Sequence, residues 1–296
     1  MSVRLTARVP ATSANLGPGF DCFGLALDLC NEVTVDTEAE PGVTWEGEGA
    51  DELPTDGTDL ISRAIRHVQL DAEGSFGGEF PLPAFHLHGV NRIPLERGLG
   101  SSSAATVAGI VLGSRLLDVP ELRDDPVRWL SLASQMEGHP DNAAAAVFGG
   151  FVIIAGADHV RLEPHPQLRP VLLIPGHVRL PTAEARRALP STVSFEDAVH
   201  EIGRAAFTVV ALTREPTKLL HGLDDRLHEA VRLAFVPEVR EVFERLREAS
   251  VPVCVSGAGP TLLAFETDGR PVPDPGEGWR VLHVAPRRIG VDVAES

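Results

Sequence analysis

The residues Pro94-Leu95-Glu96-Arg97-Gly98-Leu99-Gly100-Ser101-Ser102-Ser103-Ala104 place two glycines and three serines directly before an apolar run. That run, residues 105–112, predicts a helix that buries Val107, Ile110 and Val111 on one face. The glycines allow backbone angles that a side chain would forbid, and the serines are expected to cap the helix. Such a turn directs unpaired N–H groups and the positive end of the helix dipole at one point. It therefore predicts a phosphate-binding loop, the alternative being a helix entered through a flexible turn.

Two common phosphate motifs do not fit this stretch. The Walker loop needs a Gly-Lys-Ser/Thr sequence, and Lys218, the one lysine of the chain, lies far away. The dinucleotide fingerprint needs a third glycine at the position that Ser103 occupies. The sequence therefore predicts a phosphate loop of another kind.

Composition narrows the class of protein. The chain has 296 residues, 43% of them hydrophobic, and a net charge of −16, which argues against general nucleic-acid binding. Three cysteines are too few for a disulfide framework or a metal knuckle. We expect no signal peptide, because the N-terminal residues lack a long apolar core, and no membrane span, because no apolar run reaches the ~18 residues that a span needs. We expect a cytoplasmic protein with no membrane partner.

The order of the elements predicts an α+β protein, because strands and helices alternate without a regular βαβ repeat. We expect a domain of residues 1–157 that carries the phosphate loop and a domain of residues 158–296. An acidic, glycine-containing loop is expected at residues 38–57. The main strands are expected at residues 3–9, 23–29, 32–37, 84–90, 151–155, 171–174 and 279–286, and two more around a glycine-rich turn within residues 253–265. The main helices are expected at residues 59–68, 125–135, 182–188, 195–212, 227–233 and 239–249.

A second polar cluster, Glu137-Gly-His139-Pro-Asp141-Asn142, follows the helix expected at residues 125–135. Magnesium on nucleotide phosphates takes hard oxygen ligands, typically one carboxylate with phosphates and water. Glu137 is therefore a candidate magnesium ligand, with a hydroxyl of the serine run as a second. A plain helix–helix loop would also explain Gly138 and Pro140.

These motifs in this order resemble the GHMP kinase superfamily, named for galacto-, homoserine, mevalonate and phosphomevalonate kinases. Residues 94–104 are similar to its phosphate-binding motif, and residues 256–261 to its C-terminal glycine loop. The first motif, Pro10-Ala-Thr-Ser-Ala-Asn15-Leu-Gly-Pro-Gly-Phe-Asp21, is similar to that of homoserine kinases, whereas mevalonate kinases and galactokinases carry a basic residue there. Segments 182–190 and 225–232 resemble substrate motifs, although Glu229-Ala-Val231 replaces a frequent Gln-Pro-Tyr.

The resemblance implies a role for each matching residue. The loop from Pro94 to Ala104 would bind the ATP phosphates, and Thr182 would reach the γ-phosphate. Glu137 and Ser102, or its neighbour Ser101, would hold Mg²⁺. The substrate residues would be Asn15, Asp21, His139, Asp141, Asn142, Arg186 and Arg232.

Within that set, Asp21 would lie near the reacting hydroxyl and Asp141 would pair with the substrate ammonium. Arg186 and Arg232 would hold the carboxylate, a task suited to the bidentate guanidinium. Asp59 stands where the superfamily often has an asparagine that meets the nucleotide base.

The implied fold is the two-domain GHMP kinase fold, with an N-terminal domain like ribosomal protein S5 domain 2 and a ferredoxin-like α+β C-terminal domain. The implied reaction is ATP-dependent phosphorylation of the side-chain hydroxyl of L-homoserine, a step towards threonine. The alternatives are another GHMP-family small-molecule kinase and a non-catalytic nucleotide-binding homologue. Related kinases are often dimers, which suggests a homodimer by analogy only.

Overall fold

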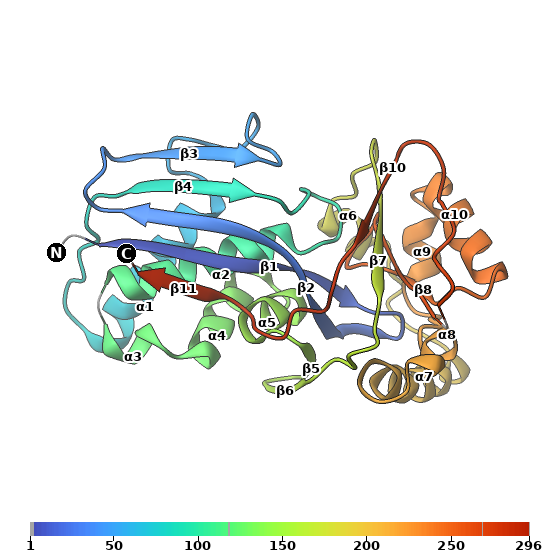
Figure 1. The fold of residues 1–296 in the computed structure, drawn as a ribbon. Helices are drawn as coiled ribbons and strands as arrows, with labels where there is room; N and C mark the ends of the chain where they lie inside the picture. Colours follow the sequence, from blue (N-terminus) through green and yellow to red (C-terminus); the bar gives the residue numbers. More distant parts are fainter. Residues whose placement is uncertain (1–2, 118, 268, 296) are drawn as a thin grey trace.

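The computed structural model describes residues 3–117, 119–267 and 269–295, without the side chains of Thr182 and Ala183. Strands and helices form two units that lie side by side, each built on its own sheet (Figure 1). The main core cluster belongs to the first unit and reaches the second sheet through Leu172, Ile174 and Leu263. The two units therefore share buried apolar surface.

The first sheet is organised around two long antiparallel strands, β1 (Arg4–Asn15) and β2 (Gly19–Asp36). Burial alternates over the first residues of β1, as the period of a strand requires, and residues 9–15 are all buried. The strand order is β11-β1-β2-β4-β3. Strand β5 pairs with residues 23–25, near the N-terminal end of β2, and with β6. The remaining strands are β3 (Gly42–Gly47), β4 (His86–Asn91), β5 (Phe151–Ala155), β6 (Asp158–Leu162) and β11 (Asp292–Glu295).

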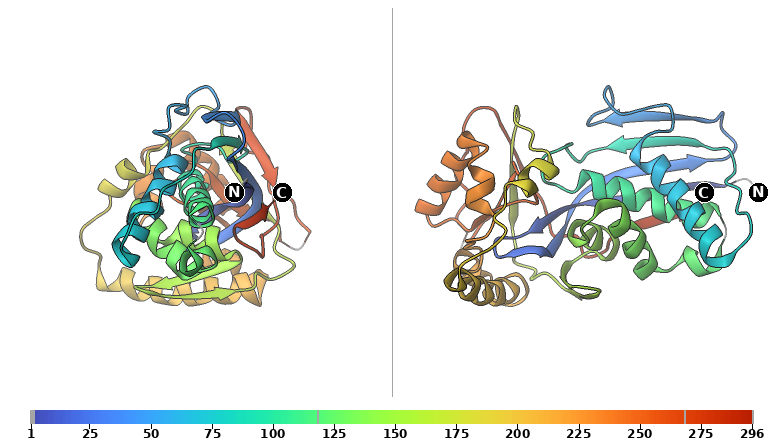
Figure 2. Two further views of the ribbon diagram at one scale, coloured as in Figure 1. Left: turned by 90° about the vertical axis from the view of Figure 1, so that its left-hand side faces the viewer. Right: turned by 180° about the vertical axis from the view of Figure 1, so that it is seen from behind.

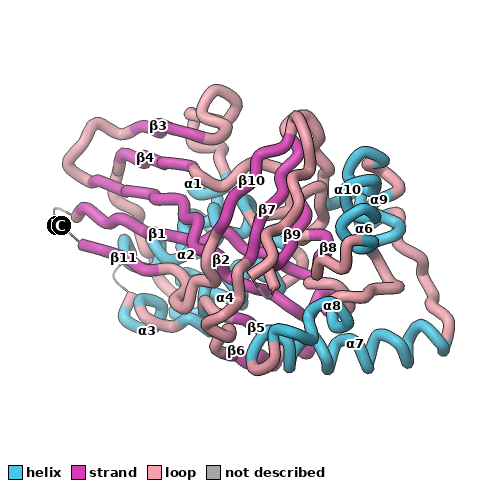
Figure 3. The backbone as a smooth tube through the Cα atoms, turned by 45° about the vertical axis from the view of Figure 1, so that its right-hand side comes forward, coloured by secondary structure: helices cyan, strands magenta, loops and turns pink. Residues whose placement is uncertain are grey.

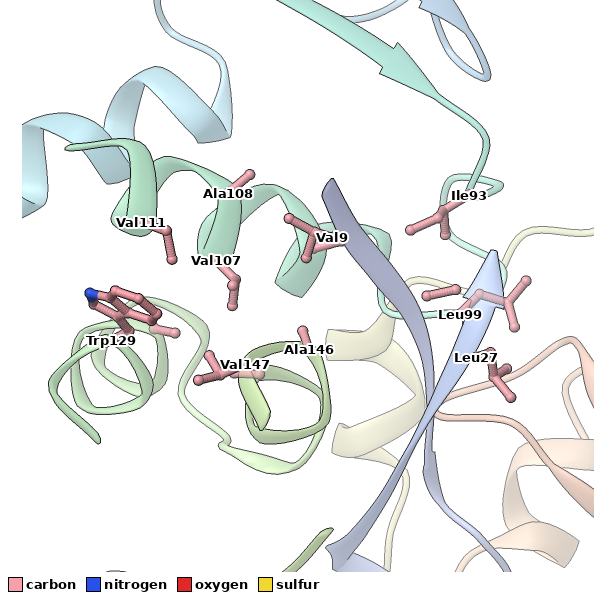
Figure 4. Packing of buried hydrophobic residues seen from close by; sticks show 14 of the residues in the cluster. Val9, Leu27, Ile93, Leu99, Val107, Ala108, Val111, Trp129, Ala146 and Val147 are labelled. Atoms are coloured by element: carbon pink, nitrogen blue, oxygen red, sulfur yellow. The ribbon is translucent and has the colours of Figure 1, made fainter. Parts of the chain in front are cut away.

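Helices cover one face of this sheet (Figure 2). The central helix α2 (Ser101–Leu116) buries Val107, Ile110 and Val111 as expected, and it packs on β1, α4 and α5. Figure 4 shows Val107 and Val111 above Trp129 and Val147. The other helices of this unit are α1 (Leu60–Phe76), α3 (Pro120–Arg123), α4 (Pro126–Glu137) and α5 (Asp141–Phe148).

The second sheet has four strands in the order β10-β7-β9-β8. Strand β7 is buried along its whole length, because it lies between two other strands and under helices. The strands are β7 (Pro170–Pro175), β8 (Val253–Val255), β9 (Leu262–Phe265) and β10 (Trp279–His283). The helices are α6 (Thr182–Arg187), α7 (Phe195–Thr213), η1 (Pro216–Lys218), α8 (Leu219–Gly222), α9 (Glu229–Leu233) and α10 (Pro237–Glu248).

Three strands were not expected from the sequence. Strand β3 occupies part of the predicted loop 38–57, and β6 and β11 were missed altogether. Strands β3, β6 and β11 each pair with one neighbour, so little of their surface is buried and the apolar alternation is weak. The division at 157/158 stays a prediction, but β6 and β11 pair with the first sheet although they follow residue 157.

No helix among the described residues is long and apolar enough to cross a membrane.

Candidate active site

A cleft of about 600 Å³ lies between the two units. It is lined by the start of α2, the end of α4, the start of α5, the end of β1, the start of β2 and residues of α6 and α9. The predicted residues that line it are Asn15, Asp21, Glu96, Arg97, Gly98, Gly100, Ser101, Ser102, Ser103, Glu137, His139, Asp141, Asn142, Arg186 and Arg232. The fold thus brings residues that are more than 200 positions apart into one site.

Four residues of the predicted phosphate loop lie elsewhere. Pro94 and Leu95 line a separate cavity of about 150 Å³. The side chains of Leu99 and Ala104 are buried in the core, and Figure 4 shows Leu99 near Ile93 and Leu27. These residues shape the loop, so any contact with a nucleotide is left to their backbone atoms.

The two loop glycines adopt positive φ values, +70° at Gly98 and +68° at Gly100. A Cβ atom on Gly98 would lie 2.1 Å from the carbonyl oxygen of Ser256, and one on Gly100 would lie 2.0 Å from Oγ1 of Thr12. Glycine is therefore required both for the backbone angles and for the close packing of Gly98 against residues 256–259 and of Gly100 against Thr12.

The predicted serine cap of α2 is wrong. The N-cap residue is Gly100, and no side chain among the described residues caps the helix. The first N–H groups of a helix lack carbonyl partners one turn earlier, so at α2 they open into the cleft together with the positive end of the helix dipole. An uncapped helix start that faces a cleft is suited to an anion.

The serines instead donate to Glu137, at the end of α4. The hydroxyls of Ser102 and Thr106 lie 2.9 and 2.7 Å from its Oε1, and that of Ser103 lies 3.0 Å from its Oε2. These three bonds hold the carboxylate of one helix against the first turn of another. The negative charge is thereby fixed beside the site where phosphates would lie.

The residues present fit a magnesium ion that also has phosphate and water ligands. Glu137 and Ser102 offer hard oxygen atoms, and one carboxylate is the usual protein share of such a site. No group of three His, Cys, Asp or Glu side chains suited to a metal occurs in the described part of the chain. The described side chains therefore suit a metal ion that takes most of its ligands from phosphate and water, and do not suit one bound by protein ligands alone.

Asp21 and Arg186 form a bidentate ion pair across the cleft, with N–O distances of 2.6 and 2.8 Å. Asp21 has a φ of 55°, and its N–H donates to Oδ1 of Asn15. The amide of Asn15 in turn donates to the carbonyl of Gly257. This chain of contacts fixes the acidic side chain of the first unit against a cationic side chain of the second.

Arg232 is buried, and its Nη1 donates to the carbonyl of Gly257 and to Nδ1 of His228. Burial, with the nearby Arg186 charge, lowers the pKa of Arg232 to about 10, so the guanidinium stays charged at neutral pH. Phe20 lies within 5.4 Å of both guanidinium groups, a cation–π arrangement. Two cations therefore lie around one aromatic ring at the edge of the cleft.

His139, Asp141 and Asn142 form a connected group at the start of α5. Nδ1 of His139 lies 3.1 Å from Oδ1 of Asp141, and this hydrogen bond raises the pKa of His139. The N–H of Asn142 donates to the same oxygen, and Oδ1 of Asn142 accepts from Thr12. Asp141 is buried, so its charge is stabilised by these donors.

The predicted role of Thr182 lies outside the described side chains, although α6 begins at this residue.

Sequence reasoning gave no role to several residues that hold the site together. The Ser256 hydroxyl donates to the carbonyl of Gly98 at 2.7 Å and lies 2.8 Å from the Ser13 hydroxyl, which can donate to it; these contacts join the glycine loops of the two units. Burial lowers the pKa of His228 to about 4, and the neutral ring contacts the carbonyl of Gly17. The sequence offered one indication of their importance: the motifs quoted above contain all four residues, Thr12, Ser13, His228 and Ser256.

Comparison with known proteins identifies the family of the chain. The model described as GHMP kinases N terminal domain matches residues 59–150, and GHMP kinases C terminal matches residues 209–271. The homoserine kinase of Clavibacter michiganensis subsp. michiganensis is 44% identical over 271 residues, covering 90% of this chain and 83% of the relative. The homoserine kinase of Streptomyces coelicolor is 42% identical over 294 residues, covering 96% of this chain and 91% of the relative.

Solved structures show the same fold. The crystal structure of homoserine kinase from Cytophaga hutchinsonii is similar with a TM-score of 0.81 and 26% identity, covering 98% of this chain and 97% of that one. Mevalonate kinase from Methanococcus jannaschii shares the fold at 12% identity, with a TM-score of 0.66 over 95% and 98% of the two chains. The predicted α+β, two-domain GHMP kinase fold is confirmed. The chain belongs to the GHMP kinases and, among them, to the homoserine kinase family.

Proposed function

We propose that this chain transfers the γ-phosphoryl group of ATP to the side-chain hydroxyl of L-homoserine, giving ADP and O-phospho-L-homoserine. The observation that carries the proposal is that the cleft joins an uncapped helix start, the Glu137 carboxylate and two arginines. The first two features suit a nucleotide triphosphate, and the arginines suit an acceptor that bears a carboxylate. The printed names of the relatives agree with this acceptor.

On the phosphate side, N–H groups of residues 98–103 would bind the ATP phosphates. Glu137 and Ser102 would hold Mg²⁺, which when bound neutralises charge on the phosphates. Phosphoryl transfer depends mainly on positioning and charge stabilisation, so the residues need supply little covalent chemistry. We therefore assign no general base.

On the acceptor side, Arg186 and Arg232 would bind the carboxylate, and Asp141 the ammonium group. In the structure Arg186 is already paired with Asp21, so a substrate carboxylate competes with Asp21 for the same guanidinium. Exchange of partners would leave the Asp21 carboxylate beside the hydroxyl that is phosphorylated. Asn15, His139 and Asn142 would orient these groups through the hydrogen bonds described above.

The proposal places the reaction in the cytoplasm, where ATP is available, and includes a homodimer by analogy with related kinases.

The test is a coupled assay of ADP release from ATP and Mg²⁺ with three alcohols. L-Homoserine should be phosphorylated; 3-amino-1-propanol, which lacks the carboxylate, and mevalonate, which lacks the ammonium group, should be poor acceptors. Equal turnover of homoserine and 3-amino-1-propanol would remove the two arginines from the acceptor site. Turnover of mevalonate alone would replace the proposal with a different kinase of the superfamily.

A further inference from the structure

Helix α7 carries an apolar face that points away from the protein. Among its large residues, Phe195 is 86% exposed, Ile202 72%, Val199 55%, Phe207 47% and Val210 36%. With Gly203 and Ala206 these residues fall within an arc of about 140° around the helix, at 100° per residue. Figure 3 shows α7 along the outer edge of the second unit. We call these seven residues the α7 stripe.

The inner side of the same helix is partly polar. Glu201 and Thr208 are buried, and Oε1 of Glu201 accepts from the N–H of Arg226. An amphipathic surface helix normally turns its apolar arc inward. A helix that buries a glutamate while it exposes Phe195 and Ile202 has an apolar surface that its own chain does not use.

Gly203 strengthens this reading. Glycine in the interior of a helix costs roughly 0.5–1 kcal/mol relative to alanine. A Cβ atom built on Gly203 would meet no atom of the described residues within 4 Å, so the fold itself does not require glycine there. Gly203 and the exposed Ala206, about one turn later, have little or no side chain. The centre of the α7 stripe is therefore shallow, and the backbone of another helix can approach it closely.

One edge of the α7 stripe carries an acidic residue at one end and a basic residue at the other, so two antiparallel copies of this edge have complementary charges. Glu196, in the first turn, and Arg214, at the C-cap, lie at the same edge of the stripe. Glu196 lies 3.4 Å from Arg226 of its own chain, but its side chain is 87% exposed and can reach a second cation. If two copies of α7 cross antiparallel at a twofold axis near residues 204–205, that edge faces itself and the order of the charges is reversed. Glu196 then meets Arg214 of the partner subunit.

The same arrangement matches the apolar residues. Ile202 packs on Phe207 of the partner subunit, Val199 on Val210 of the partner subunit, and the small residues lie at the crossing. Arg204, the charge nearest the axis, is directed at the carbonyl of His221 and at Asp224 of its own chain. The antiparallel helix dipoles are also favourable.

We infer that the α7 stripe is the contact surface between two copies of this chain, in an antiparallel twofold dimer. The inference rests on the homodimer included in the proposed function and names the surface through which its two subunits would make contact. Because no residue of α7 lines the cleft in the described chain, the inference can be tested without the reaction. A membrane surface is the less suitable occupant: interfacial helices carry Lys and Arg on their polar side, whereas the first turn of α7 carries Glu196 and Asp197.

Sedimentation equilibrium of the full chain, without substrates, measures the association directly. We expect a monomer–dimer equilibrium for the wild type. Ile202→Glu should raise the dissociation constant roughly 100-fold, because the substitution occurs twice in a symmetric contact. The matched control is Leu70→Glu on α1, which is 65% exposed and should leave the dimer intact.

A charge exchange tests the antiparallel register. Glu196→Arg and Arg214→Glu should each weaken the dimer, and the double variant should restore it. A wild-type chain that stays monomeric, a dimer unchanged by Ile202→Glu, or a monomer that pellets with anionic phosphatidylserine vesicles would each overturn the inference. Failure to phosphorylate homoserine with an intact α7-dependent dimer would instead count against the proposed function alone.

Discussion

Replacing Glu137 by glutamine tests the phosphate side of the cleft most directly. Glutamine keeps one oxygen that can accept from Ser102 and Thr106, but its amide nitrogen cannot accept from Ser103 and carries no negative charge. Hydrogen bonds to charged groups contribute about 1.5–3 kcal/mol each. Loss of the charge-assisted contact to a magnesium ion should therefore raise the half-saturating Mg²⁺ concentration about 10- to 100-fold and lower kcat strongly.

The assay is ADP release at saturating ATP and homoserine over a titration of Mg²⁺. Glu244→Gln on α10, which breaks only an exposed ion pair with Arg240, is the matched control and should behave as the wild type. Thermal unfolding checks that α2 and α4 remain packed. A folded Glu137→Gln chain with an unchanged Mg²⁺ titration would show that this carboxylate does not hold the metal.

Three further changes test other parts of the structure. Arg186→Gln removes the bidentate partner of Asp21, and we expect KM for homoserine to rise about 10- to 100-fold with KM for ATP unchanged; a rise in KM for ATP alone would contradict the assignment. Gly98→Ala should abolish measurable ATP binding by calorimetry, since the added carbon meets the Ser256 carbonyl, whereas Gly57→Ala, also at positive φ but with no described atom within 4 Å, should cost stability only. Burial raises the pKa of Glu201 to about 7, so the folded state retains a proton that the unfolded chain loses near pH 4.5, and stability falls as pH rises between these values. Glu201→Gln should therefore raise Tm relative to the wild type at pH 8 more than at pH 5, and an equal difference at both would refute the buried-acid explanation.

The sequence indicated which residues gather in the cleft better than it indicated the strands of the sheets. Gly98, Gly100 and Glu137 could be identified because their chemistry needs particular residue types at particular spacings, and such motifs are legible locally. Strands β3, β6 and β11 could not, because edge strands bury little; in addition, the partners of β3 and β11, which are β4 and β1, are distant in sequence.

The helix cap shows a different limit. Ser101, Ser102 and Ser103 satisfy the local rule for capping, but Ser102 and Ser103 donate instead to a carboxylate 35 and 34 residues away. Glu229 was similarly read as a departure from a motif, whereas its fully buried carboxylate accepts from the N–H of Val255, and burial raises its pKa. In both cases a tertiary partner decided the role of a side chain, and local spacing contains no information about that partner.

The return of the chain to β11 has a mechanical consequence. The second unit begins after β6 and ends before β11, so two covalent connections, residues 163–169 and 284–291, join it to the first. A body attached at two points can rotate about the line through them but cannot swing freely on a tether. Any opening of the cleft would therefore be a rotation about one axis. The paired strands β1 and β11 bring both ends of the chain to the far side of the first unit, away from the cleft (Figure 1).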